Sequence, residues 1–143
     1  MVDASKIADV MGGPAVLGSS VTSIMELAGA VSDGLPKAAL RKTAQRLFEK
    51  PSDVNSMMYK VVPEATYKRR TRLTPTESER TERLARVIAL AEYVWDDPEP
   101  AHMWMTKPHP ELGGKSPIQC AMTELGARQV EYILHSLFYG IPP

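Results

Sequence analysis

Residues 73–95 read LTPTESERTERLARVIALAEYVW, and this stretch decides the fold class. It begins with a strong helix start, because Thr74 can cap the helix, Pro75 suits the first helical position and Glu77 can complete a capping box. From Leu84 to the end of the stretch, apolar residues recur at steps of three and four, which predicts a long amphipathic helix. Caps followed by the same periodicity recur along the chain and predict an all-α protein.

Upstream of this stretch we expect a helix that is capped by Ser20 and ended by Gly34. Three further helices are predicted over residues 36–48, 53–59 and 63–70, with Pro36 in the first turn of the first of them. A short N-terminal helix would bury three apolar residues and end at a glycine-glycine-proline turn, namely Ile7, Val10, Met11 and residues 12–14.

Downstream, residues 96–100 end the long helix and open a short one that contains Trp104. A loop over 108–114 follows, and Ser116 with Pro117 restarts a helix by a cap and a proline. The last helix is expected over 124–139, with one apolar face made of Val130, Ile133, Leu134, Leu137 and Phe138.

The charge is unevenly distributed, although the 143 residues have a formal net charge of zero. Residues 1–72 hold 11 Lys and Arg against 7 Asp and Glu, whereas residues 73–143 hold 6 against 10. A basic front half favours a polyanionic partner, although an imbalance of this size also arises by chance. The single cysteine, Cys120, excludes an intrachain disulfide, no apolar run reaches the length of a membrane span, and the N-terminus lacks a secretory signal. We therefore expect a cytoplasmic protein.

The three helices over 36–70 have the order and tight connections of a helix-turn-helix. The last of them carries short polar residues at its start and cations at its end, as a recognition helix requires. The predicted DNA-binding residues are Glu64, Thr66 and Tyr67 at base edges and Lys68, Arg69, Arg70 and Arg72 at phosphates. The alternative is that this basic run is a solvated face or a linker. A single unit of this kind binds weakly, so specific binding predicts a dimer.

No arrangement in the sequence predicts catalysis, a metal site or a cofactor. The carboxylates Glu77, Glu79 and Glu82 suit a helix N-terminus, and the last two are expected to pair with Arg83 and Arg86. The three histidines lack metal-ligand spacing, and residues 112–117 lack the spacing of a phosphate-binding loop. We therefore expect no enzymatic activity.

From Gly34 onward the chain resembles the Xre/MbcA/ParS antitoxins that pair with RES-domain toxins. The resemblance covers about 110 residues, and Met105 and residues 120–122 are its visible departures. Its motifs, in order, are Gly34-Leu35-Pro36, Thr66 to Arg70, Leu73 to Arg80, Leu112-Gly113-Gly114-Lys115-Ser116-Pro117, Thr123 to Ala127 and Tyr139-Gly140.

The resemblance implies a Cro-like helix-turn-helix region (34–72) and a helical toxin-binding domain (73–143), and residues 1–33, which lie outside it, are expected to be an N-terminal helical extension. It implies an antitoxin that represses its own operon as a homodimer bound to operator DNA. It also implies that the antitoxin covers the active-site entrance of a RES-domain toxin, which consumes NAD. The residues expected to contact the toxin are Leu112, Gly113, Gly114, Lys115, Ser116, Arg128, Tyr132, His135 and Tyr139.

A second reading of the same residues remains open. The chain is then a plain helix-turn-helix transcriptional regulator, whose C-terminal half only dimerises or senses a small ligand. A small enzyme is the third and remotest hypothesis.

Overall fold

The computed structural model describes residues 2–140, which form ten α-helices and one 3₁₀-helix with no β-strand among them. This confirms the predicted all-α class. The elements are α1 (Ala4–Val10), α2 (Gly13–Leu17), α3 (Ile24–Asp33), α4 (Lys37–Leu47), α5 (Pro51–Val61), α6 (Glu64–Arg69), α7 (Pro75–Trp95), α8 (Pro98–Thr106), η1 (Pro110–Leu112), α9 (Pro117–Cys120) and α10 (Glu124–Tyr139).

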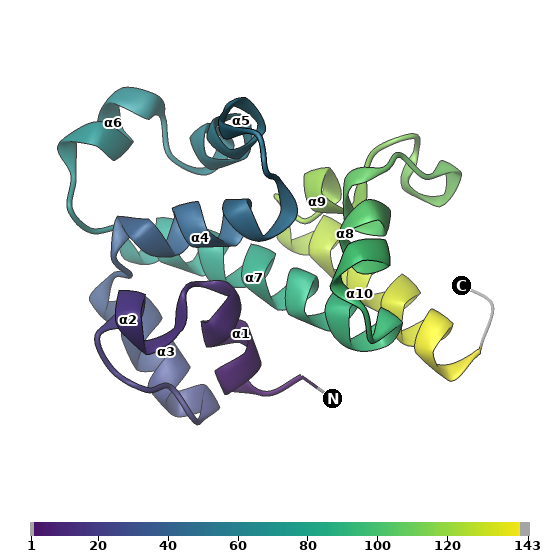
Figure 1. Cartoon of the computed structure of the whole chain (residues 1–143), viewed down its shortest axis with the longest axis horizontal. Helices are drawn as coiled ribbons and strands as arrows, with labels where there is room; N and C mark the ends of the chain where they lie inside the picture. Colours follow the sequence, from purple (N-terminus) through teal and green to yellow (C-terminus); the bar gives the residue numbers. More distant parts are fainter. Residues whose placement is uncertain (1, 141–143) are drawn as a thin grey trace.

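The long helix α7 is the centre of the molecule (Figure 1). It packs against α1, α3, α4 and α5 of the front half and against α8 and α10 of the back half. The predicted capping box is present, because the Thr74 hydroxyl accepts from the Glu77 amide and the Glu77 carboxylate accepts from the Thr74 amide. Residues 87–91 are buried without interruption, as expected for a helix segment that is surrounded by other helices.

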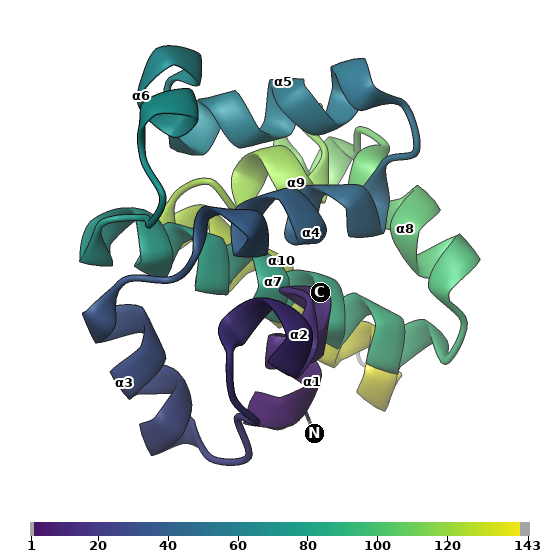
Figure 2. The same cartoon turned by 60° about the vertical axis from the view of Figure 1, so that its left-hand side comes forward.

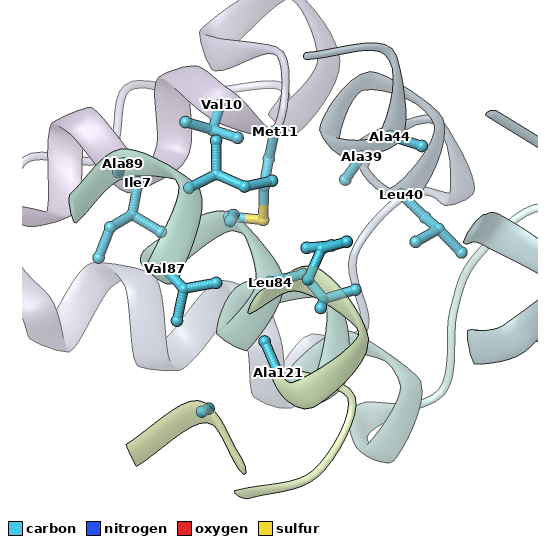
Figure 3. Packing of buried hydrophobic residues seen from close by; sticks show 14 of the residues in the cluster. Ile7, Val10, Met11, Ala39, Leu40, Ala44, Leu84, Val87, Ala89 and Ala121 are labelled. Atoms are coloured by element: carbon cyan, nitrogen blue, oxygen red, sulfur yellow. The ribbon is translucent and has the colours of Figure 1, made fainter. Parts of the chain in front are cut away.

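The buried side chains form one hydrophobic core that runs from Ala4 to Leu134. Met11, Leu40, Leu84 and Ala121 all belong to it, although they come from segments far apart in the sequence (Figure 3). The front and back parts of the chain therefore share a core. A separate observation is that no helix in the described residues has the length and apolarity to span a membrane.

The N-terminal segment differs from its prediction in two places. Ser23 rather than Ser20 caps α3, because its hydroxyl accepts from the Glu26 amide at 3.1 Å. The short N-terminal helix forms as expected, but Pro14 does not simply end it. Proline suits a first helical turn, and Pro14 stands in the first turn of α2, a helix that the sequence reading missed.

The helix-turn-helix region has the predicted order of helices with shifted bounds. Pro36 precedes α4 as its cap residue instead of lying in its first turn. The next helix, α5, begins at Pro51 and not at residue 53, because proline is favoured at the first helical position. It continues to Val61, so it is no shorter than α4.

The apolar face of α10 is shorter than predicted. Val130, Ile133 and Leu134 are buried, whereas Leu137 and Phe138 are 45% and 42% exposed. Phe138 instead stacks on Tyr93 of α7, with 5.3 Å between the ring centroids. Leu137 and Phe138 lie at the edge of the core, where the last turn of α10 extends beyond its buried segment.

Candidate functional site

The helix-turn-helix consists of α4, α5 and α6, with α5 and α6 lying above α4 in Figure 2. Only Val62 and Pro63 separate α5 from α6. Tyr67 anchors α6 on α4, since it is 4% exposed and its hydroxyl donates to the Lys37 carbonyl oxygen at 3.2 Å. The side chain of Tyr67 is therefore used for packing and offers little surface to a base edge, so a base contact by Tyr67 stays a prediction.

The remaining predicted residues of α6 are exposed or half-buried. Glu64 and Lys68 form an i,i+4 ion pair with 2.8 Å between nitrogen and oxygen, and both side chains are more than half exposed. Thr66 is half-buried and Arg69 is exposed. A surface pair of this kind is weak, so Lys68 can exchange Glu64 for another anion at little cost.

Arg70 and Arg72 contact the protein itself. Arg70 donates to the Glu77 carboxylate at 2.6 Å, and Arg72 donates to the Gly34 carbonyl oxygen at 3.0 Å. Burial alone would raise the pKa of Glu77, but hydrogen bonds from Thr74 and Arg70 outweigh it and hold this pKa below its ordinary value. These contacts fix the connection between α6 and α7, so the structure gives both arginines a structural role that the sequence did not reveal.

Two further cations lie beside α6 and were not predicted as DNA contacts. Lys37 and Arg41, both on α4, stand over the Tyr67 ring at 4.9 and 5.5 Å from its centroid. Their i,i+4 spacing on a polar face was visible in the sequence. The position of these two cations beside α6 was not visible, because it depends on the burial of Tyr67.

A second face lies on the outer side of α10. Arg128, Tyr132, His135 and Tyr139, four of the residues expected to bind toxin, recur there at steps of three and four and are exposed. Leu125 extends the same row at seven residues before Tyr132 and was missed. The exposed fractions of Leu125, Tyr132 and Tyr139 are 75%, 53% and 65%. We call these five residues the outer face of α10.

The loop that was expected to bind toxin divides into a tip and two anchors. Gly113, Gly114 and Lys115 are exposed, and both glycines adopt a positive φ that side chains disfavour. Leu112 is buried, and Ser116 is buried because its hydroxyl caps α9 through the Gln119 amide. Leu112 and Ser116 therefore hold the tip in place, and direct toxin contacts by these two residues stay a prediction.

A charged cluster joins α4, α7 and α8. The Arg46 guanidinium of α4 donates twice to the Glu92 carboxylate of α7, both at 2.8 Å, and His102 of α8 contacts the same carboxylate. Burial would raise the pKa of Glu92, but the hydrogen bonds from Arg46 and His102 outweigh it and lower this pKa. No group of His, Cys, Asp or Glu within residues 2–140 is arranged to hold a metal ion.

The fold and the basic helix α6 define a helix-turn-helix protein that carries a further helical part. Comparison with known proteins agrees. The family described as the antitoxin Xre-like helix-turn-helix domain matches residues 26–86, and the antitoxin Xre/MbcA/ParS C-terminal toxin-binding domain matches residues 90–140. The antitoxin Xre of Pseudomonas putida is 30% identical over 124 residues, which cover 84% of this chain and 76% of that protein.

The chain belongs to the Xre/MbcA/ParS antitoxin family, and it is an antitoxin with a helix-turn-helix and a toxin-binding domain. The resemblance drawn from the sequence is thereby confirmed. The two matched regions meet inside α7, so both domains use this helix.

Proposed function

We propose that this antitoxin neutralises a RES-domain toxin that degrades NAD. In this proposal the outer face of α10 and the loop tip at 113–115 cover the entrance to the active site of the toxin. The single observation that supports it is the row of large, exposed side chains on α10. Exposed apolar and aromatic side chains on one helix face mark a protein-binding surface, and tyrosines contribute strongly to such interfaces.

The second part of the proposal is repression of the antitoxin's own operon. A homodimer would place two copies of α6 on successive half-sites of the operator, with Glu64 and Thr66 at base edges and Lys68 and Arg69 at phosphates. The functional division then falls near Leu73, within one shared core. We further propose that the chain acts in the cytoplasm and has no chemistry of its own.

The toxin-binding part is tested by co-expressing a RES-domain toxin with the Leu125→Ala, Tyr132→Ala double variant. We expect loss of co-purification and a fall in cellular NAD to the level seen with toxin alone, because two anchors of the face are removed. Met25→Ala is the matched control, since Met25 is an equally exposed apolar residue on α3. Full protection by the double variant would contradict the proposed interface.

The DNA-binding part is tested by Arg69→Ala in operator-binding titrations at several salt concentrations. Loss of one phosphate contact should weaken binding and lower the slope of log affinity against log salt by about one. Arg80→Ala, at an exposed cation on α7, is the control and should leave the slope unchanged. Equal slopes for both variants would remove Arg69 from the interface.

A further inference from the structure

A notch of about 360 Å³ lies at the surface between α4, α5 and α6, and it joins Tyr67 and Lys68 of α6 to residues of α4 and α5 that were not expected to contact DNA. Its charged lining residues are all cations, on two different helices. Lys37, Ala38, Arg41, Tyr59, Tyr67 and Lys68 line it.

The two cations of α4 are held in position by the protein. The Lys37 ammonium donates to the Tyr67 carbonyl oxygen at 3.1 Å and lies over the Tyr67 ring, which also supports the Arg41 guanidinium. Within residues 2–140, neither cation forms an ion pair with a carboxylate. An ammonium has three N–H donors and a guanidinium five, so most of their donors are left for a ligand.

The other lining residues suit the same kind of ligand. Lys68 is 68% exposed, and its pairing with Glu64 is a solvent-exposed contact that a stronger anion can replace. Tyr59 packs edge-on against Tyr67, with 6.2 Å between the ring centroids, and its hydroxyl is a further donor. Cationic side chains that the protein already holds in place lose less side-chain entropy on binding an anion than mobile cationic side chains do.

We propose that this notch binds a phosphate group, with Lys37, Arg41 and Lys68 as its ligands. The chemistry required is a compact oxyanion, which a DNA backbone or free inorganic phosphate can supply. We assign it to the backbone of the operator, because Lys68 belongs to the recognition helix and continues the notch onto it. The assignment rests on the proposed repressor function and adds a phosphate contact from α4 to those from α6.

The test uses the full-length protein, an operator duplex and a random duplex, titrated by fluorescence anisotropy across a range of salt concentrations. Arg41→Gln should weaken binding to both duplexes by about tenfold, the size expected for one charge-assisted hydrogen bond. It should also lower the salt slope by about one, since a phosphate contact carries no sequence information. Arg41→Lys should restore the slope because it keeps the charge.

Lys42→Gln is the matched control, because Lys42 is the exposed neighbour on α4 and does not line the notch. Both glutamine variants are first compared by denaturant midpoint, so that a loss of binding is read only for folded protein. If Arg41→Gln binds DNA like Lys42→Gln, the assignment to the DNA backbone is wrong.

Inorganic phosphate provides the arm that separates the two sources of the anion. Its titration is followed by the NMR signal of the Arg41 side chain. Saturation at millimolar phosphate, with unchanged DNA binding by Arg41→Gln, would show a site for free phosphate and overturn the DNA assignment. If Arg69→Ala loses DNA binding and Arg41→Gln does not, the DNA phosphate site proposed in the notch is wrong, and the proposed repressor function is not contradicted. If the unsubstituted protein binds no duplex, both the repressor function and the DNA assignment are wrong.

Discussion

Two glycines inside helices have opposite surroundings, although both look like weak points in a helical sequence. A Cβ atom on Gly126 of α10 would lie 1.9 Å from the Cys120 carbonyl oxygen and 2.8 Å from its carbon. A Cβ atom on Gly29 of α3 would meet nothing within 4 Å. Gly126 therefore allows α10 to start against the end of α9. No close contact in the structure requires a glycine at position 29.

Alanine substitutions at these two positions should have opposite effects on stability. Gly126→Ala should lower the free energy of unfolding by about 1 to 3 kcal/mol, because the backbone of Cys120 must move to make room. Gly29→Ala should raise it by about 0.5 to 1 kcal/mol, since alanine loses less conformational entropy in a helix. Urea unfolding measures both, and a destabilised Gly29→Ala variant would mean that α3 is not an ordinary exposed helix.

Single residues also show which contacts a sequence can predict. The capping boxes at Thr74 and Ser116 lie within four residues, so local spacing is enough to find them. Arg83 was expected to pair with Glu79, four residues away, but it contacts Glu124 at 3.2 Å. Its partner is 41 positions along the chain, and only the packing of α10 on α7 brings the two together.

At the scale of elements, the carboxylate of Glu92 ties three helices together. It joins α7 to α4 through Arg46 and to α8 through His102, and Arg46 also approaches Asp9 of α1 at 3.6 Å. Folding lowers the pKa of Glu92. The ionised Glu92 carboxylate therefore adds its full contribution to the stability of the fold at pH values above its ordinary pKa near 4.5. The contribution is lost as the pH falls from there through the lower pKa of the folded state.

Glu92→Gln should therefore destabilise the protein near neutral pH and flatten its acid sensitivity. We expect a loss of about 1 to 3 kcal/mol at pH 7, typical of a hydrogen bond to a charged group, with a smaller difference from the unsubstituted protein near pH 3. Urea unfolding at both pH values measures this. Glu79→Gln, at an exposed position on the same helix, is the control. Equal losses at pH 7 and pH 3 would mean that charge is not the cause.

The two binding elements were predictable to different degrees. The family resemblance implied four of the five residues of the outer face of α10, and the structure places these four on one exposed side of the helix. The residues of α6 were harder, because a short helix has no clear buried stripe. Tyr67 is buried through its contact with α4, 30 residues away, and no local pattern indicates that contact.

At the scale of the whole molecule, the single core means that the functional boundary proposed near Leu73 does not coincide with a structural one. Helix α7 lies beyond that boundary, yet it packs on α1, α3, α4 and α5. The length and composition of the chain are compatible with one core or with two small ones, so they do not decide between these arrangements. The choice depends on which helices share α7, and this is a property of tertiary packing.

A fragment of residues 1–72 should therefore fail to fold. Without α7 it exposes the core faces of α1, α3 and α4, and the remaining short helices are marginal in water. We expect a disordered fragment by circular dichroism and proton NMR, whereas the full chain should unfold in one transition seen equally by both probes. A stable fragment, or two separate transitions in the full chain, would contradict the shared core.

The shared helix also bears on how such antitoxins can recombine. A gene fusion that joins the front of one family member to the back of another at residue 73 would replace α7 along with the back half, and the acquired helix would have to fit a foreign α1, α3 and α4. A junction inside α7, between the two matched regions, would still divide contacts, because Arg46 of α4 pairs with Glu92 on one side of it and Arg83 pairs with Glu124 of α10 from the other. New pairings of operator and toxin specificity should therefore require matched changes along this helix, wherever the crossover falls.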